Sequence, residues 1–253
     1  MRFYAPDIPV DGTPVSLPQD EAHHLAHVMR LGVGRSVHVF DGRGHEYRAE
    51  ILEVSRRGVV VRPIERVEAA RESALRVVLA QAVLKGDHMD AVVRDATMMG
   101  VAEIVPILTD HVVVPARALA GSGPGSRWWR VALGAAKQCG RAVVPSISPP
   151  ARLAEIVRPG TPTVMLVEPR CTGQSATGIA ALAKDRREVL LLVGPEGGWS
   201  EAELAAAAQA GVHRWSLGPR TLRADSAAMV ALSILGYLSG WTAPPAAARP
   251  DAG

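Results

Sequence analysis

The sequence predicts an α/β protein with a smaller, β-rich domain in front of it. From Leu75 onward, apolar runs of strand length alternate with amphipathic runs of helix length, which is typical of a parallel sheet covered by helices. The first third instead contains short strand-like runs joined by glycine-containing turns. The 253 residues are 48% hydrophobic and 21% charged, so the chain can bury the core of one large or two small domains.

The N-terminal third begins with a short predicted helix, Glu21–Met29, for which Asp20 is the expected cap. Three strand-like runs follow it, and the dipeptides Asp41-Gly42 and Arg57-Gly58 are typical of the turns between them. We expect these strands to form a small closed barrel. The predicted strands are Ser36–Phe40, His45–Val54 and Gly58–Ile64.

Three histidines, His23, His24 and His27, lie in the predicted helix, and the first and third share a face. They raise the question of a metal site, but no cysteine or carboxylate completes a ligand set. We therefore expect no metal, and favour surface histidines that lie near RNA.

The second region opens with the strand-like run Leu75–Val83. An apolar stripe at helical spacing follows and ends at Gly100, and it predicts a helix whose stripe faces the core; the strand-like run Ala102–Leu108 comes next. Lys85 and Asp87 lie in the turn between strand and helix, where ligand binding and ordinary solvation are both open. The stripe consists of Met89, Val92, Val93, Ala96 and Met99.

The glycine-rich segment Gly121–Ser126 predicts a mobile loop, and a helix is expected after it over Arg127–Arg141. The basic side chains of this helix, together with Trp128 and Trp129, suit a grip on RNA phosphates with stacking on a base. The alternative is that one tryptophan is core and the other covers the helix. Further predicted elements are the strands Thr163–Val167, Val189–Val193 and Arg214–Leu217, the helix Ala227–Ser239 and a disordered tail from Thr242 to Gly253.

Two loops in the last quarter are the main site candidates, LLVGPEGGWS (Leu191–Ser200) and SLGPRTLRADSA (Ser216–Ala227). Each follows an apolar run and precedes a helix-like run, so both should emerge at the ligand-binding edge of a parallel sheet. The glycines of the first loop permit close backbone approach, and Glu196 places an anion there. Because proline and a carboxylate oppose a phosphate cradle, we expect a neutral or cationic ligand.

The second loop carries Arg220 and Arg223 just before Asp225 and Ser226, which are expected caps of the following helix. Two guanidiniums beside a helix start suit an RNA phosphate or a uracil oxygen. The alternative is an ordinary strand-to-helix turn whose arginines pair with Glu196 and Asp225.

Composition narrows the class of protein. The chain contains no Walker loop, no Gly-x-Gly-x-x-Gly and no zinc-spaced cysteines, so nucleotide-dependent and zinc chemistry have no motif support. Cys139 and Cys171 are expected to be free thiols. No apolar run is long enough to span a membrane and no signal-peptide pattern begins the chain, so we expect a cytoplasmic protein without membrane contact. The formal net charge is only +3.

The combination of GPEGG with LGPRTLRAD resembles the RsmE family of bacterial 16S ribosomal RNA uridine N3-methyltransferases, which belongs to the SPOUT, or trefoil-knot, class. The resemblance extends over further motifs from Arg2 to about Gly240: HHLAHVMRLGVG, FDGRG, KGDHMD, GVAEIVPI and KQCGR. The chain departs from the family pattern at Arg94–Met99, where the family usually has Lys-Ala-x-Glu-Leu. It also has Asp225-Ser226 where the family has Glu-Thr.

The resemblance implies a PUA-like RNA-binding β-barrel over residues 1–72, a SPOUT-type α/β trefoil-knot domain over 73–241 and a tail over 242–253. It also implies a homodimer, and S-adenosylmethionine bound among three knot loops, Leu166–Arg170, Gly194–Trp199 and Leu217–Ala224. The cofactor-binding residues expected on this basis are Leu166, Glu168, Pro169, Gly194, Pro195, Glu196, Gly197, Gly198, Leu217, Gly218, Leu222, Arg223 and Ala224.

The expected activity is methyl transfer from S-adenosylmethionine to N3 of a uridine in 16S ribosomal RNA of the small subunit. Arg220 or Arg223 would stabilise charge on the uracil oxygens, and Glu196 or Asp225 would accept the N3 proton or face the sulfonium. Two alternatives stay open: a non-catalytic RNA-binding or ribosome assembly factor, and a SPOUT methyltransferase with another RNA target. The residues expected to contact RNA are Arg2, Arg30, Arg35, Lys85, Arg127, Lys137 and Arg141.

Overall fold

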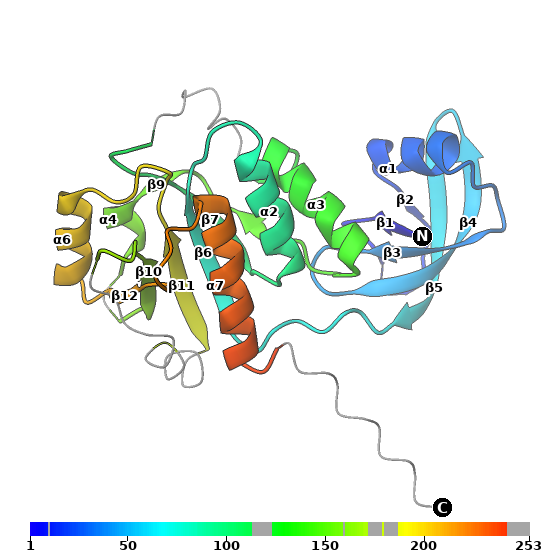
Figure 1. Ribbon diagram of the computed structural model, residues 1–253. Coiled ribbons are helices and arrows are strands. Elements are labelled where there is room, and N and C mark those ends of the chain that lie inside the picture. Colours follow the sequence, from blue (N-terminus) through cyan, green and yellow to red (C-terminus); the bar gives the residue numbers. More distant parts are fainter. Residues whose placement is uncertain (10, 113–122, 159, 172–178, 180–186, 242–253) are drawn as a thin grey trace, which may run out of the picture. The chain divides into compact units, whose positions relative to one another are not determined.

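The computed structural model describes residues 1–9, 11–112, 123–158, 160–171, 179 and 187–241, and Figure 1 shows its ribbon. The chain forms two compact units. Unit 1 comprises residues 1–72, 93–98 and 121–147, and unit 2 comprises residues 73–92, 99–120 and 148–253. The predicted tail 242–253 and the first two residues of the predicted loop Gly121–Ser126 lie outside the described residues.

Unit 1 contains a five-stranded sheet in the order β1-β3-β4-β5-β2. The parallel pairing of β1 with β3 brings the N-terminus into the sheet, whereas the other neighbours are antiparallel. The predicted strands are confirmed with small shifts, and the short strands β1 and β2 were not predicted. The bounds are β1 (Arg2–Tyr4), β2 (Val15–Ser16), β3 (Ser36–Phe40), β4 (Glu46–Ser55) and β5 (Gly58–Val67).

This sheet curls around its own apolar core (Figure 1). The β4–β5 ladder has two register irregularities, between Arg48 and Ala49 and between Ile51 and Glu53, and such bulges increase local twist. The curl brings buried side chains from both ends of the sheet together in one cluster, which includes Phe3, Leu17, Leu25, Val37, Val39, Ile51, Val59 and Val61.

The predicted N-terminal helix is present but is not a regular α-helix. Helix α1 (Gln19–His23) continues directly into a π-helical turn, η1 (His24–Val28). The expectation that Asp20 caps it was wrong: the cap position is Pro18, without a side-chain cap, and Asp20 lies in the first turn. Beyond the turn, Arg30 has φ +52°, which among described non-glycine residues is the only left-handed backbone.

Unit 1 also contains α3 (Arg127–Cys139), the short strand β8 (Ser146–Ile147) and the last part of α2 (His88–Met98). Ser126 Oγ accepts a hydrogen bond from the Trp129 N–H and caps α3. Trp128 is buried, and Trp129 packs edge-on against Tyr4 with ring centroids 5.5 Å apart. The packing reading of the two tryptophans therefore describes the structure.

Unit 2 contains a parallel sheet in the order β12-β10-β11-β6-β7, with β9 beside β7. The alternating strands and helices expected from Leu75 onward are confirmed, apart from the unpredicted short elements β9 and α4. The strands are β6 (Arg76–Ala82), β7 (Glu103–Leu108), β9 (Ala151–Arg152), β10 (Thr163–Leu166), β11 (Glu188–Val193) and β12 (His213–Trp215).

Helices cover both faces of this sheet. Successive strand residues point to opposite faces, and one face packs against Leu153 of α4 (Leu153–Ile156) and Ala207 of α6 (Glu201–Gln209). Helix α7 (Ala224–Leu238) packs against β11 (Figure 1) and buries Ala228, Leu232 and Leu235. It begins three residues earlier than predicted, so Asp225 and Ser226 lie in its first turn and Arg223 is the cap position. None of the described helices combines the length and apolar character needed to cross a bilayer.

Candidate functional site

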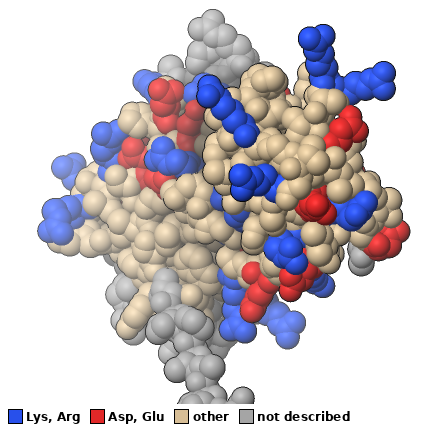
Figure 2. Space-filling model, turned by 90° about the vertical axis from the view of Figure 1, so that its right-hand side faces the viewer, with Lys and Arg blue, Asp and Glu red and all other residues tan. Residues whose placement is uncertain are grey.

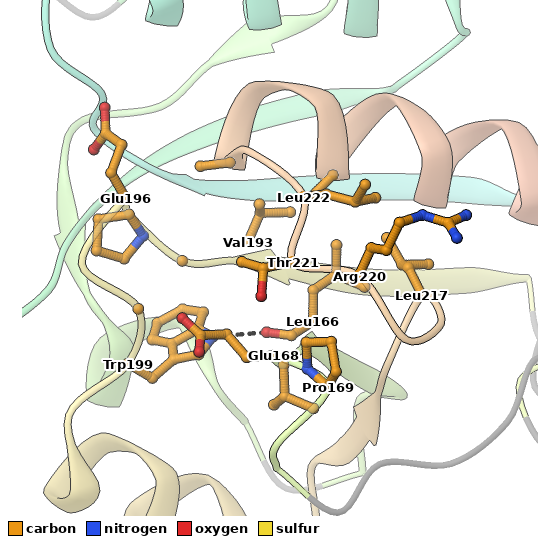
Figure 3. Close-up of a pocket in the computed structure, with 16 residues that line it drawn as sticks. Leu166, Glu168, Pro169, Val193, Glu196, Trp199, Leu217, Arg220, Thr221 and Leu222 are labelled. Carbon is orange, nitrogen blue, oxygen red and sulfur yellow. Dashed lines mark hydrogen bonds between the residues drawn. The ribbon is translucent and has the colours of Figure 1, made fainter.

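A pocket opens at the carboxyl ends of β10, β11 and β12, where the loop after each strand contributes to its wall. Carboxyl ends of parallel strands are the usual ligand-binding edge of such a sheet. The space between its walls, counted together with the solvent at its open side, is about 600 Å³. Figure 3 shows the residues that line it: Leu166, Val167, Glu168, Pro169, Val193, Gly194, Pro195, Glu196, Gly198, Trp199, Leu217, Arg220, Thr221, Leu222, Ala224 and Ala227.

Trp199 joins two of these loops. Its indole N–H donates to the carbonyl oxygen of Leu166 at 2.8 Å, the dashed line in Figure 3. The ring lies so close to Gly194 that a Cβ there would be 3.0 Å from Trp199 Cε2. The tryptophan ring therefore leaves little room for a side chain at position 194, and its hydrogen bond joins the first and second loops.

Two independent features favour glycine at position 198. Its φ of +71° is a conformation that side chains with a Cβ rarely adopt. A Cβ would also lie 3.1 Å from Glu168 Oε1, at the pocket wall. The turn itself is closed by the Gly198 N–H, which donates to the Pro195 carbonyl at 3.0 Å.

The polar groups around the pocket do not all face it. In Figure 3 the Glu168 carboxylate and the Thr221 hydroxyl point inward, whereas the Glu196 carboxylate and the Arg220 guanidinium point away. The inner wall is mainly apolar, with Leu166, Val193, Leu217 and Leu222. A ligand that carries positive charge and an apolar ring fits this wall better than a polyanion does.

The sequence-predicted cofactor residues are mostly brought together here. Ten of them line the pocket: Leu166, Glu168, Pro169, Gly194, Pro195, Glu196, Gly198, Leu217, Leu222 and Ala224. Gly197, Gly218 and Arg223 lie beside the lining residues and do not form the wall. Five further lining residues were not named individually from the sequence: Val167, Val193, Trp199, Thr221 and Ala227. Three of them, Val167, Trp199 and Thr221, lie within the three predicted knot loops.

A second polar cluster forms where the first residue of α2 meets the start of α7. His88 Nδ1 lies 3.1 Å from Asp225 Oδ2, and Arg223 Nη2 lies 3.1 Å from the same nitrogen. Arg223 also contacts Asp225 at 3.3 Å, yet its side chain is 68% exposed. His88 was not predicted, and its place in the KGDHMD motif was the available signal.

The pKa of Asp225 is lowered. Partial burial alone would raise it, but hydrogen bonds from Ser226 and the charges of Arg223 and His88 outweigh that effect. Asp225 thus pairs with one of the two arginines, as the alternative reading of this loop expected. Between Arg220 and Glu196, by contrast, the described residues contain no ion pair.

The predicted RNA-contacting residues divide into two groups. Arg2 donates to both carboxylate oxygens of Glu46, Lys137 lies 2.7 Å from Glu21 Oε2, and Arg141 donates to both oxygens of Glu72. These three side chains have structural contacts within unit 1 and are largely buried. Arg30, Arg35, Lys85 and Arg127 are exposed.

Charge on the side of the molecule seen in Figure 2 is mixed, with acidic side chains among the basic ones. No group of three His, Cys, Asp or Glu that could hold a metal occurs within the described part of the chain. His23 and His27 pack ring to ring at 4.7 Å, and His24 packs edge-on against Phe3. Cys139 and Cys171 are free thiols.

Comparison with known proteins identifies two matching family models and relatives of similar length. Residues 71–236 match the family model of an RNA methyltransferase domain, and residues 17–64 match that of an RNA methyltransferase PUA domain. A ribosomal RNA small subunit methyltransferase E from Mycobacterium tuberculosis is 31% identical over 253 residues, which is 96% of this chain and 94% of the relative.

Two solved structures resemble the whole fold. A protein from Legionella pneumophila, solved with the cofactor SAM bound, superposes with a TM-score of 0.82 at 30% identity, covering 93% of this chain and 96% of that one. A ribosomal RNA small subunit methyltransferase E from Neisseria gonorrhoeae, bound to S-adenosyl methionine, gives 0.79 at 28% identity, covering 94% and 97%.

Proposed function

Because the chain belongs to the RNA methyltransferase family, as a relative of ribosomal RNA small subunit methyltransferase E, we propose that it transfers a methyl group from S-adenosylmethionine to N3 of a uridine in 16S ribosomal RNA. The observation that carries this proposal is the pocket at the carboxyl ends of β10, β11 and β12. Three loops meet there, and the two solved relatives named above hold that cofactor.

The residues of the pocket fit this cofactor. Leu166, Val193 and Leu222 offer an apolar wall for an adenine ring, and the backbone at Gly194 and Gly198 permits close approach. Glu168 is the carboxylate that faces inward, and it suits a cationic centre. Because Glu196 points away from the pocket, we assign the contact with positive charge to Glu168 in its place.

When bound, S-adenosylmethionine supplies an electrophilic methyl group on a sulfonium. The chain contributes by holding the cofactor loops rigidly, since a fixed approach of nucleophile and methyl removes much of the entropic barrier. Trp199 contributes to this rigidity because its indole N–H donates a hydrogen bond from the Gly194 loop to the Leu166 carbonyl. Thr221 offers a hydroxyl at the inner wall as a hydrogen-bond partner.

Arg223 is the residue that we assign to charge stabilisation on the uracil. Charge develops on the uracil oxygens only as the N3 proton leaves, and an exposed guanidinium at the start of α7 can donate to them. The lowered pKa of Asp225 makes it a weak proton acceptor, so its proposed role is to hold Arg223 and His88 in place. Arg220 points away from the pocket and is better placed for an RNA phosphate.

For RNA contact we propose the exposed basic residues Arg30, Arg35, Lys85 and Arg127. Arg30 follows a π-helical turn and has a strained backbone, two features that are frequent at functional sites. Arg2, Lys137 and Arg141 are left out of this proposal because carboxylates already neutralise them.

The family resemblance adds three further parts to the proposal: a trefoil knot formed by the pocket loops, pairing of two copies, and action in the cytoplasm, where the proposed substrate is made. Light scattering of the purified protein tests the pairing, and a mass of one chain would contradict it.

The decisive experiment uses small ribosomal subunits from a strain that lacks the enzyme. After incubation with the protein and S-adenosylmethionine, mass-spectrometric mapping of the 16S RNA should find one added methyl group, on N3 of a single uridine. Calorimetry should find S-adenosylmethionine binding to the protein alone. Binding without uridine methylation but with a different methylated nucleotide would mean another RNA target, and absence of cofactor binding would favour an assembly factor.

A further inference from the structure

The segment that follows β7 contacts the Gly194–Trp199 loop, although it belongs to none of the three loops that wall the pocket. His111 Nδ1 lies 3.0 Å from the carbonyl oxygen of Gly197 and 3.1 Å from that of Gly198. Carbonyl oxygens can only accept hydrogen bonds, so Nδ1 must carry a proton and donate to both. Both the neutral Nδ1–H tautomer and the imidazolium meet this requirement.

Gly197 gives an independent sign of the same contact. A Cβ at this position would lie 3.1 Å from His111 Cβ, which is tighter than nine in ten real Cβ contacts. Unlike Gly198, Gly197 is not in the left-handed region of φ. The approach of His111, and not the backbone conformation, therefore accounts for the absence of a side chain at position 197.

His111 is itself anchored. The neighbouring Asp110 accepts a hydrogen bond from Ser200 Oγ at 2.6 Å, and its backbone N–H donates to Glu203 Oε1 at 3.1 Å. Ser200 and Glu203 also form the capping box of α6, and Glu203 is buried. The segment is thus bound to the start of α6, directly after the loop that His111 contacts.

The geometry of one peptide shows what this contact does. The Gly198–Trp199 peptide is trans, so its N–H points opposite to its carbonyl. The carbonyl faces His111, which does not line the pocket, while Gly198 and Trp199 do. None of the described residues accepts a hydrogen bond from the Trp199 backbone N–H. This donor is therefore available to a ligand.

We propose that His111 is a positioning residue for cofactor binding: by holding the Gly197 and Gly198 carbonyls outside the pocket, it directs the Trp199 N–H to an acceptor on the cofactor. The inference rests on the proposed function, because the cofactor is S-adenosylmethionine. His111 does not touch the reacting atoms, so it acts on the affinity for the cofactor and not on the methyl-transfer step.

The test compares two substitutions of His111. His111→Leu keeps bulk but removes the donor, and should weaken S-adenosylmethionine binding in calorimetry about tenfold, the loss expected for one or two hydrogen bonds. KM for the cofactor should rise equally, with kcat at saturating cofactor unchanged within about twofold. His111→Asn places an amide N–H near the position of Nδ1 and should restore most of the affinity.

Hydrogen exchange gives a readout that does not depend on activity. Amides of residues 196–200 should exchange faster in His111→Leu than in the wild type or in His111→Asn, without a change in thermal unfolding. His27→Leu is the matched control, since His27 is an exposed histidine on η1. It should leave cofactor affinity unchanged.

The outcomes separate the two proposals. If the wild type does not bind S-adenosylmethionine, the proposed function fails and this inference fails with it. If the wild type binds it and His111→Leu binds it equally well, the role of His111 is overturned while the proposed function stands. A fall in kcat without a change in affinity would also overturn it.

Discussion

Two regions of this protein contain many of the motif residues, the pocket of unit 2 and an ion-pair cluster in unit 1. In the first region the polar groups are open to a ligand, and in the second they pair with one another. In the pocket of unit 2, glycines and Trp199 fix the backbone, and the Glu168 carboxylate faces an open space. In the ion-pair cluster of unit 1, made of Arg2, Lys137, Arg141 and their carboxylate partners, the charges neutralise one another.

The difference shows what a basic motif can predict. A guanidinium binds a ligand only if the fold leaves its donors accessible. The Arg141 guanidinium instead donates hydrogen bonds to Glu72 and to the carbonyl of Thr97. Its side chain is 7% exposed, against 68% for Arg223. Substitutions in the first region should therefore change function with little effect on stability, and substitutions in the second should do the reverse.

The largest effect is expected at Gly198. Gly198→Val introduces backbone strain and a clash with Glu168, and a displacement of the loop by about 1 Å should weaken S-adenosylmethionine binding about a hundredfold or more. Calorimetry measures this. Gly211→Val is the matched control, because Gly211 has nearly the same φ, +72°, but nothing within 4 Å of its Cβ position. If both variants lose S-adenosylmethionine binding equally, the loss is caused by backbone strain and not by the contact of residue 198 with Glu168.

Next in size is the loss of the Arg141 contacts. Arg141→Leu leaves Glu72 and the Thr97 carbonyl without their donor, and should lower the free energy of unfolding by about 3 kcal/mol. Chemical denaturation measures the change. Arg130→Leu, on the exposed side of α3, should change it by less than about 0.5 kcal/mol. If the Arg141→Leu protein keeps its stability but binds RNA more weakly, Arg141 contacts RNA and does not stabilise the fold.

The third prediction concerns the activation free energy of methyl transfer, which should rise on substitution of Arg223 by an amount similar to the loss of stability predicted for Arg141→Leu. Arg223→Ala should lower kcat about a hundredfold, as expected for removal of one charge-stabilising donor, while the KM for RNA changes little. Unfolding should be almost unaffected because the side chain is exposed. Lysine at this position should recover only part of the rate. If RNA affinity falls and kcat does not, Arg223 is a phosphate contact.

The smallest effect concerns acid stability of unit 1. Burial alone would raise the pKa of Glu46, but hydrogen bonds and charge from Arg2, with a further contribution from His38, hold it below its ordinary range. The unfolded chain therefore takes up this proton first as the pH falls, and the stability contributed by Glu46 is lost between its ordinary pKa and its lowered one. Glu46→Gln should flatten that part of the stability profile. An unchanged acid slope would contradict the assignment.

Most elements were predictable because they have a strong local period. The stripe from Met89 to Met99 is helical in α2, and the strand-like run at Ser36–Phe40 is β3. What the sequence did not indicate were elements with two residues, such as β2 and β9, and the π-helical turn after His23. Such short elements form only because residues far away in the chain pair with them or pack against them.

For the candidate site, the sequence by itself determined the loops. The glycines and prolines of GPEGG and LGPR restrict the backbone locally, so their positions after strands are readable without the fold. The direction of each side chain was decided only by the tertiary structure. The Glu196 carboxylate points away from the pocket and the Glu168 carboxylate points into it. His88 and His111 come from the segments that follow two other strands. The basic residues Arg2, Lys137 and Arg141 pair with carboxylates that are 44, 116 and 69 residues away in the chain, respectively. Backbone conformation is a local property, whereas the pairing of a charge depends on which distant residue the fold places beside it.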